Sequence, residues 1–188
     1  QMPLIESAAT NGILHATVND VGLPFVAVLD NQLLGFDIEL LKRFAAYEGK
    51  AIEFSNADFS SLVAAVASGK ADLIASSIFI TDERKKQINF SDPYYEMGAR
   101  LFALKQNIAD ASGINAAPVV PPADHKLRSV DDLKHKRIAV LLGSVHDSYA
   151  LKNFPQAEVM QYKSPSDILL AVKSGKVDAA IYTRETLV

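Results

Sequence analysis

The chain has 188 residues, of which 49% are hydrophobic, and its 19 basic and 22 acidic residues give a formal net charge of −3. This length suffices for one good-sized domain or two small lobes, and the well-mixed charges form no basic patch of the kind that binds nucleic acid. Cysteine is absent, which excludes disulfides and thiolate zinc sites, and no apolar run approaches the ~20 residues that span a bilayer.

The first half of the chain predicts strands that alternate with helices after an irregular lead-in at 3–12. Strands are expected at 13–18, 51–54 and 73–75, and helices from Asp37 to Gly49 and from Phe59 to Gly69. Leu40, Leu41 and Phe44 form an apolar stripe on the first helix. Glycine at each helix end tolerates the left-handed conformation that such an ending needs.

The second half repeats this alternation after a long interruption. Residues 106–126 are rich in Ala, Pro, Asn and Asp, which indicates an irregular surface insertion. Strands are expected at 101–104, 137–141, 158–162 and 177–182, and helices at 144–154 and 166–174. Strand–helix–strand alternation of this kind favours a parallel sheet with helices on its faces.

An internal repeat suggests how the chain is divided. Residues 59–74 align without gaps on residues 165–180, and seven of the sixteen positions are identical, including Ser-Gly-Lys-x-Asp in both copies. Joints between a helix and a strand commonly favour such residues, but two similar α/β lobes in one chain explain the match better. We therefore predict lobe I at 1–99 and lobe II at 100–188.

The stretch from Ser68 to Tyr95 contains a candidate anion site. Ser76 and Ser77 follow a short apolar strand, and ligands of open α/β sheets bind beyond the carboxyl ends of strands. Thr81 is a predicted N-cap, and Arg84 follows within the first turn of the helix that it starts. A guanidinium beside free backbone N–H groups is a good receptor for a carboxylate.

Three motifs in this sequence carry a resemblance to a known family. They are GFDIELL at 35–41, SGKADLIASSIFITDER at 68–84 and FSDPYY at 90–95. With these motifs the chain resembles the extracellular solute-binding proteins of family 3, which serve polar amino-acid ABC transporters and related sensors. The resemblance implies a periplasmic-binding-protein-like α/β fold of two lobes joined by a hinge, with the ligand in the cleft between them. It also implies a C-terminal return segment to the first lobe, which we expect to be missing from this chain.

The resemblance also assigns ligand-binding positions in both lobes. Arg84 would hold a carboxylate, the Ser76 carbonyl would receive an amine, and Phe59 would face the ligand side chain or else pack in the core. Gly143 and Ser144 open a helix whose free N–H groups offer a second carboxylate contact, although ordinary helix capping explains them equally well. The complete set is Arg84, Ser76, Ser77, Phe59, Phe79, Thr81, Gly143, Ser144, Val145 and Thr183.

The chain departs from the family pattern at three of these positions. Members that bind α-amino acids usually carry an acidic residue where this chain has Thr183, and supporting hydroxyl residues where it has Phe79 and Val145. The carboxylate anchor is therefore present, while the amine anchor and two hydroxyls are not. We expect weak binding of simple polar amino acids, because a buried ammonium without a partner is costly.

The function expected from the resemblance is binding of a small carboxylate-bearing solute, an amino acid or a similar compound, for an ABC transporter. The partner would be a membrane permease. Two alternatives remain open: the input domain of a membrane signalling protein and, with less support, a dehydratase-like enzyme. Ser144, His146 and Asp147 have the residue types of a hydrolase triad, but they lie on one helical turn without a nucleophile elbow.

We therefore expect no catalytic residue, no metal site and no cofactor. The four histidines show no metal-ligand spacing, and glycine-rich phosphate motifs are missing. The chain opens on Gln1 without a signal peptide, which we interpret as a processed or cut N-terminus. The resemblance implies a periplasmic or extracellular location, with membrane anchoring left open.

Overall fold

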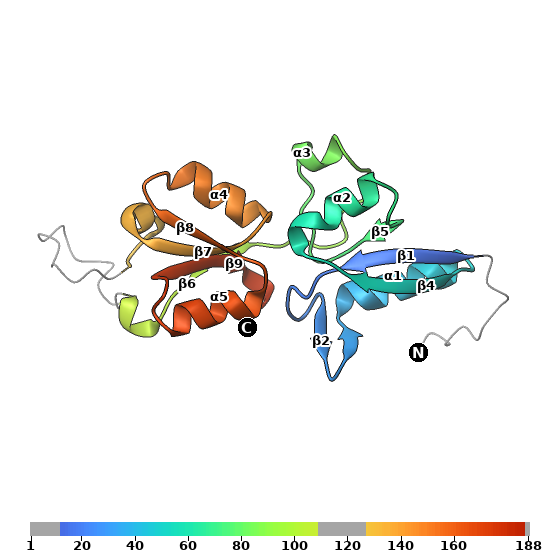
Figure 1. Ribbon diagram of the computed structural model, residues 1–188, viewed down its shortest axis with the longest axis horizontal. Coiled ribbons are helices and arrows are strands. Elements are labelled where there is room, and N and C mark those ends of the chain that lie inside the picture. Colours follow the sequence, from blue (N-terminus) through green and yellow to red (C-terminus); the bar gives the residue numbers. More distant parts are fainter. Residues whose placement is uncertain (1–11, 109–126, 187–188) are drawn as a thin grey trace, which may run out of the picture. The chain divides into compact units, whose positions relative to one another are not determined.

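The computed structural model describes residues 12–108 and 127–186 (Figure 1). These residues form two compact units, unit 1 up to Met97 and unit 2 from Gly98. The sequence placed this boundary between residues 99 and 100. The lead-in expected at 3–11 and most of the insertion expected at 106–126 lie outside the described residues.

Unit 1 is built on a three-stranded parallel sheet. Its strands are β1 (Ile13–Val18), β4 (Ala51–Asn56) and β5 (Leu73–Ile74), in the order β4-β1-β5. The hairpin of β2 (Ala27–Leu29) and β3 (Gln32–Leu34) follows β1, and the helices are α1 (Phe36–Tyr47), α2 (Leu62–Ala67) after the 3-10 turn Phe59–Ser61, and α3 (Asp82–Lys85). Figure 1 shows α1 and α2 on opposite faces of the sheet.

The start of α1 depends on a glycine. Gly35 has a φ of 127°, and a Cβ at this position would lie 2.1 Å from the carbonyl oxygen of Phe25. Because only glycine allows this approach, the Phe36 and Asp37 amides donate to the carbonyls of Pro24 (2.7 Å) and Phe25 (3.1 Å). The backbone before the hairpin therefore closes the N-terminus of α1 and fixes the position of Asp37.

Unit 2 is built on a four-stranded mixed sheet. Its strands are β6 (Ala99–Phe102), β7 (Arg137–Leu141), β8 (Glu158–Tyr162) and β9 (Ala179–Thr183), in the order β6-β9-β7-β8. β6 is antiparallel to β9, and the other pairs are parallel. The helices α4 (Val145–Asn153) and α5 (Pro165–Lys173) lie on opposite faces of this sheet (Figure 1), and 3-10 turns occur at Lys105–Asn107, Val130–His135 and Arg184–Thr186.

The core of unit 2 explains why its strands were easy to predict. β7 and β9 are buried along almost their whole length, as expected for strands covered on both faces. Ile138 and Val140 pack with Ala150 and Phe154 of the α4 region and with Ile181 of β9. Ala150 and Phe154 therefore attach the α4 region to the sheet.

The internal repeat corresponds to one joint that occurs in both units. Gly69 after α2 and Gly175 after α5 have φ angles of 72° and 69°, and in each copy the following aspartate binds a strand of the same unit, β1 in unit 1 and β7 in unit 2. Asp72 accepts from the His15 amide and Asp178 from the Arg137 amide, both at 2.9 Å. The two copies of Ser-Gly-Lys-x-Asp thus end a helix and bind a strand amide in the same way.

Candidate functional site

The candidate site of unit 1 begins where its parallel strands end. Ser76 follows β5 and is fully buried, and its hydroxyl accepts a hydrogen bond from the Asn19 amide, which follows β1 (2.8 Å). The Asn19 side chain donates to the carbonyl of Ala57, just after β4 (2.8 Å). These bonds join the three strand ends, so the Ser76 hydroxyl is engaged within the protein and only its backbone remains as a candidate ligand group.

Ser77 adopts a backbone conformation that is rare for serine, with a φ of 47°. Its amide donates to a carboxylate oxygen of Asp37 (2.8 Å), and the Tyr94 hydroxyl donates to the other oxygen (3.0 Å). Asp37 is fully buried, and this burial raises its pKa although both hydrogen bonds act in the opposite direction. The Ser77 amide is therefore already engaged inside unit 1.

Arg84 contacts Thr81, Phe79 and Phe59. The predicted N-cap at Thr81 is confirmed, since its hydroxyl accepts from the Arg84 amide (3.2 Å). The Arg84 Nη1 donates to the carbonyl oxygen of Phe79 (2.7 Å), and the guanidinium carbon lies 5.9 Å from the centre of the Phe59 ring. Phe59 itself is buried, so its core role is real, and its ring also forms a cation–π contact with Arg84.

The environment of Arg84 suits an anion. Burial lowers the pKa of the guanidinium from its usual value, yet arginine stays charged at neutral pH. A partly buried cation that is oriented by a backbone carbonyl and an aromatic face attracts a negative group strongly, because the surrounding protein screens the charge less than water does. This arrangement can bind a carboxylate.

Aromatic rings join the three sequence motifs next to this site. The Phe36 ring of the first motif lies 5.9 Å from the Tyr94 ring and 6.0 Å from the Tyr95 ring of the third motif. Tyr95 also packs edge-to-face on Phe25 at 5.1 Å. With the bonds from Asp37 to Ser77 and Tyr94, residues from all three motifs meet at one place in unit 1.

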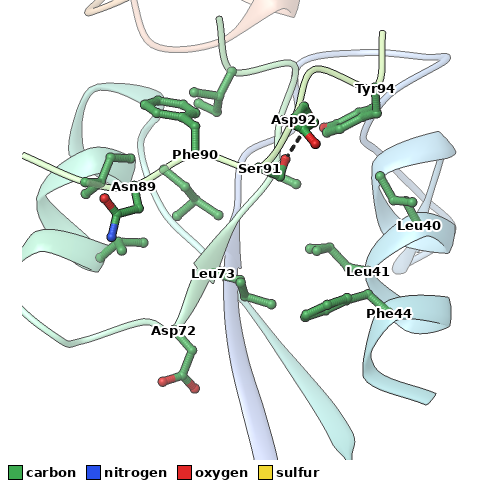
Figure 2. A pocket seen from close by; sticks show the side chains of 15 residues that line it. Leu40, Leu41, Phe44, Asp72, Leu73, Asn89, Phe90, Ser91, Asp92 and Tyr94 are labelled. Atoms are coloured by element: carbon green, nitrogen blue, oxygen red, sulfur yellow. Dashed lines mark hydrogen bonds between the residues drawn. The ribbon is translucent and has the colours of Figure 1, made fainter. Parts of the chain in front are cut away.

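Two hollows in unit 1 border this cluster. One of about 310 Å³ is lined by Asp37, Ser77, Phe79 and the segment 90–97, and therefore adjoins the loop that orients Arg84. The other, of about 510 Å³, lies over β5 and is mostly apolar. Figure 2 shows Leu40, Leu41 and Phe44 of α1 on one side of it and the segment 89–94 on the other. Neither hollow is lined by Arg84.

The predicted site residues of unit 2 cap a helix. Ser144 is the N-cap of α4 and accepts from the Asp147 amide (3.2 Å), while the Asp147 carboxylate accepts from the Gly143 amide (2.9 Å) and from the Gln161 side chain. The Gly143 amide is thus already engaged. Ser144 and Asp147 serve the helix start, and Val145 is the first residue of α4.

Thr183 is the last residue of β9 and is buried. It pairs with Ala99 of β6, and its carbonyl accepts from the Thr186 hydroxyl (2.8 Å). Glu185, two residues further along the chain, is bonded to the side chain of Arg184 (2.9 Å) and to the Gly98 amide (3.3 Å). This carboxylate is therefore already partnered inside unit 2.

Among residues 12–108 and 127–186, no group of three or more acidic or histidine side chains is arranged to hold a metal ion. No helix within the same ranges is both long and apolar enough to cross a bilayer.

Sequence reasoning missed Asp37 and Tyr94 as parts of the site. Both lie inside the motifs GFDIELL and FSDPYY, but Asp37 was read only as the start of a helix. An acidic residue between the apolar residues Phe36 and Ile38 was the available signal. Burial of a carboxylate is rare unless it is paired, so such a position is worth examining.

Several proteins that are named as amino-acid-binding proteins are similar to this chain. A probable histidine-binding protein of Campylobacter jejuni is 32% identical over 87% of the chain, and an L-arginine-binding protein of Pseudomonas aeruginosa is 32% identical over 81%. The chain spans 57% and 53% of the lengths of these two relatives.

Solved structures show the same fold. An ancestral arginine-binding protein bound to arginine has a TM-score of 0.80 and 31% identity, with 94% of this chain and 72% of that one covered. An ancestral amino-acid-binding protein, described as a precursor of cyclohexadienyl dehydratase, has a TM-score of 0.78 and 29% identity, with 91% and 70% covered.

Two α/β units with polar residues at their strand ends define the class of this protein, and the predicted fold of the two-lobed periplasmic binding proteins is confirmed. The chain belongs to the bacterial extracellular solute-binding proteins, family 3, whose family model matches residues 14–153. The relatives named above are binding proteins rather than enzymes.

Proposed function

We propose that this chain binds a small carboxylate-bearing solute, an amino acid or a close analogue, as the solute-binding component of an ABC transporter. It would act outside the cytoplasmic membrane and deliver its ligand to a membrane permease. The relatives are longer than this chain, which spans 53 to 57% of the lengths of the two curated relatives named above. The proposal therefore concerns the activity of the whole protein in those relatives.

The observation that carries this proposal is the placement of Arg84. Its guanidinium is partly buried near the carboxyl edge of a parallel sheet, where the Phe79 carbonyl and the Phe59 ring orient it. A guanidinium can bind both oxygens of a carboxylate at once. We propose that Arg84 is the central ligand anchor and that the Ser76 carbonyl, Phe59 and Phe79 lie beside the ligand.

The similar proteins support the ligand class. The curated relatives are named for histidine and arginine, and an ancestral arginine-binding protein has been solved with arginine and with glutamine. All three amino acids share an α-carboxylate, which is the group that Arg84 is suited to hold. Their side chains differ, so the shared chemistry is the carboxylate and not one particular amino acid.

A binding screen tests the proposal. L-Arginine, L-histidine, L-glutamine and the deaminated analogues 5-guanidinopentanoate and imidazolepropionate would be added to the chain, and the melting temperature followed. A ligand that binds the native state raises this temperature. Calorimetry would then give the affinity, and at least one carboxylate of this panel is expected to bind.

Variants at Arg84 test its role in the same assay. Arg84→Ala should weaken binding by about 2–5 kcal/mol, as expected when one partner of a buried charge pair is lost. Arg84→Lys should also bind more weakly, because an ammonium does not reproduce the two-pronged geometry. Lys85→Ala, which removes an exposed cation from the same turn, is the matched control and should change little. Unchanged affinity in Arg84→Ala would contradict the assignment.

A further inference from the structure

We infer that Asp37 is a positioning residue for the ligand-binding loop, defined as residues 76–79, and through this loop for Arg84. The inference rests on the proposed function, because it concerns the same site. Asp37 is not one of the ligand-contacting groups proposed above. It acts on them from inside unit 1, through hydrogen bonds to Ser77 and Tyr94.

The first step of the argument is the burial of Asp37. Its side chain is completely inaccessible to solvent, although it carries an ionisable group. A buried carboxylate is costly unless donors compensate it. The Ser77 amide and the Tyr94 hydroxyl are such donors, at 2.8 and 3.0 Å, one on each carboxylate oxygen. An apolar residue would fill the same space at a lower cost in free energy. We therefore infer that the carboxylate has a role other than packing.

The second step is the backbone of Ser77. A φ of 47° is strained for serine, and the residue keeps this conformation because its amide is bonded to the buried carboxyl group of Asp37. Leaving that buried amide without an acceptor would cost its full desolvation free energy. The turn at Ser77 sets the direction in which the chain leaves β5. Without Asp37, the backbone would relax toward the conformations that serine prefers.

The third step connects this turn to the ligand anchor. Two residues beyond Ser77, the Phe79 carbonyl accepts from the Arg84 guanidinium at 2.7 Å. A change in direction at Ser77 therefore moves the acceptor that orients Arg84. The other arm of Asp37 reaches Tyr94, whose ring packs on Phe36. Asp37 thus links α1, the ligand-binding loop and the segment that contains Tyr94.

The chain provides a matched control for this role. Asp72 lies at the other end of β5 and accepts from the His15 amide at 2.9 Å, almost the same bond as that from Ser77 to Asp37. Loss of either carboxylate removes one backbone hydrogen bond next to β5. Asp72 is exposed and Asp37 is buried, so the comparison controls for the loss of a backbone bond beside β5, and Asp37→Asn controls for the loss of side-chain volume. Only Asp37 lies on the side of the ligand-binding loop.

Hydrogen exchange of the unliganded 188-residue chain is the first test, with Asp37→Ala and Asp72→Ala compared with the wild type. In Asp37→Ala, the Ser77 amide should exchange at least about tenfold faster, since it loses its acceptor. In Asp72→Ala, the Ser77 amide should keep its protection, while the His15 amide loses it. If Asp37→Ala does not fold, Asp37→Asn keeps the side-chain volume and gives the same measurement at smaller amplitude.

Calorimetry is the second test, with the carboxylate of the panel above that binds the wild type best. Asp37→Ala should weaken binding by about tenfold or more, Tyr94→Phe should weaken it less, and Asp72→Ala should leave it unchanged, all at a temperature where every variant is folded. Unchanged protection of Ser77 in Asp37→Ala would overturn the inference, as would unchanged affinity. If the wild type bound none of the panel, the proposed function would fail, and the exchange of Ser77 would still decide whether Asp37 holds the loop.

Discussion

Asp37 and His146 are both buried and ionisable, but their surroundings differ in kind. Asp37 has a donor on each oxygen, which supports its charged form against the effect of burial. His146, on α4, faces the ring of Tyr182 at 6.1 Å between ring centres. Burial lowers the pKa of His146 to about 4, so the native state strongly prefers the neutral imidazole.

His146 predicts that unit 2 is less stable in mild acid. The unfolded chain takes up a proton on this residue near pH 6.5, whereas the folded chain does so only near pH 4. Stability is therefore complete above pH 6.5 and is lost as the pH falls from 6.5 to 4. We expect a loss of about 2 kcal/mol between pH 7 and pH 5, measured by urea unfolding followed by circular dichroism.

Two variants separate this effect from other acid effects. His146→Phe keeps an aromatic ring beside Tyr182 and should remove most of the loss between pH 7 and pH 5. His15→Gln changes an exposed histidine on β1 and should leave the loss of stability between pH 7 and pH 5 unchanged. If His146→Phe lost as much stability as the wild type, the acid sensitivity would come from other groups.

The parts of the candidate site that the sequence predicted are the ones with short-range causes. Thr81 caps a helix by bonding the amide three residues ahead, which is a preference that a local pattern reveals. Ser77 depends on Asp37, 40 residues away, and Asp37 on Tyr94, 57 residues away. No local pattern in the sequence predicts these bonds.

Among the secondary-structure elements, two strands of unit 2 were predicted best. The strands at 137–141 and 158–162 have the predicted bounds. For 137–141 the reason is that a buried strand is a nearly continuous apolar run. β6 starts two residues before the predicted position, since its pairing with β9 places Ala99 opposite Thr183. The strands of the β2–β3 hairpin have three residues each, too few for a pattern to show.

The repeated joint allows a prediction for equivalent residues. Asp72 and Asp178 each bind a backbone amide, but Asp178 also accepts from the Arg137 side chain at 2.8 and 3.2 Å, and these bonds lower its pKa. Asp72→Ala should destabilise its unit by about 1 kcal/mol, as for one lost hydrogen bond. Asp178→Ala should cost more, as measured by denaturant unfolding.

Arg137→Met tests where this difference comes from. It removes the guanidinium but keeps the backbone amide that donates to Asp178. In this background Asp178→Ala should cost no more than Asp72→Ala does in the wild type. A cost that stayed larger would show that the two joints differ in more than the ion pair.

The whole molecule consists of two units with one plan. The order strand–helix–strand–helix–strand is β1-α1-β4-α2-β5 in unit 1 and β7-α4-β8-α5-β9 in unit 2. β1 lies between β4 and β5, as β7 lies between β8 and β9. Unit 1 inserts the β2–β3 hairpin before its first helix, whereas Gly143 and Ser144 lead directly into α4. The family resemblance assigns proposed ligand positions to both units, and these positions remain predictions.

The last prediction concerns which ligand this chain prefers. The family resemblance implies an acidic partner for the ligand ammonium at the position of Thr183. Thr183 is buried and neutral, and the nearby Glu185 is bonded to Arg184. An ammonium brought there without a carboxylate partner loses hydration without full compensation. We therefore expect 5-guanidinopentanoate, which keeps a carboxylate for Arg84 but lacks the α-amino group, to bind more tightly than L-arginine.

Thr183→Asp should reverse this preference, because it supplies the missing partner for the ammonium. We expect the ratio of the two affinities to move toward L-arginine by about tenfold or more, which corresponds to at least ~1.4 kcal/mol. Thr183→Asn, of nearly the same size but uncharged, should not reproduce the shift. Calorimetry with both ligands on the three proteins decides the matter. Nanomolar binding of L-arginine by the wild type, with no gain in Thr183→Asp, would show that another group already pairs with the ammonium.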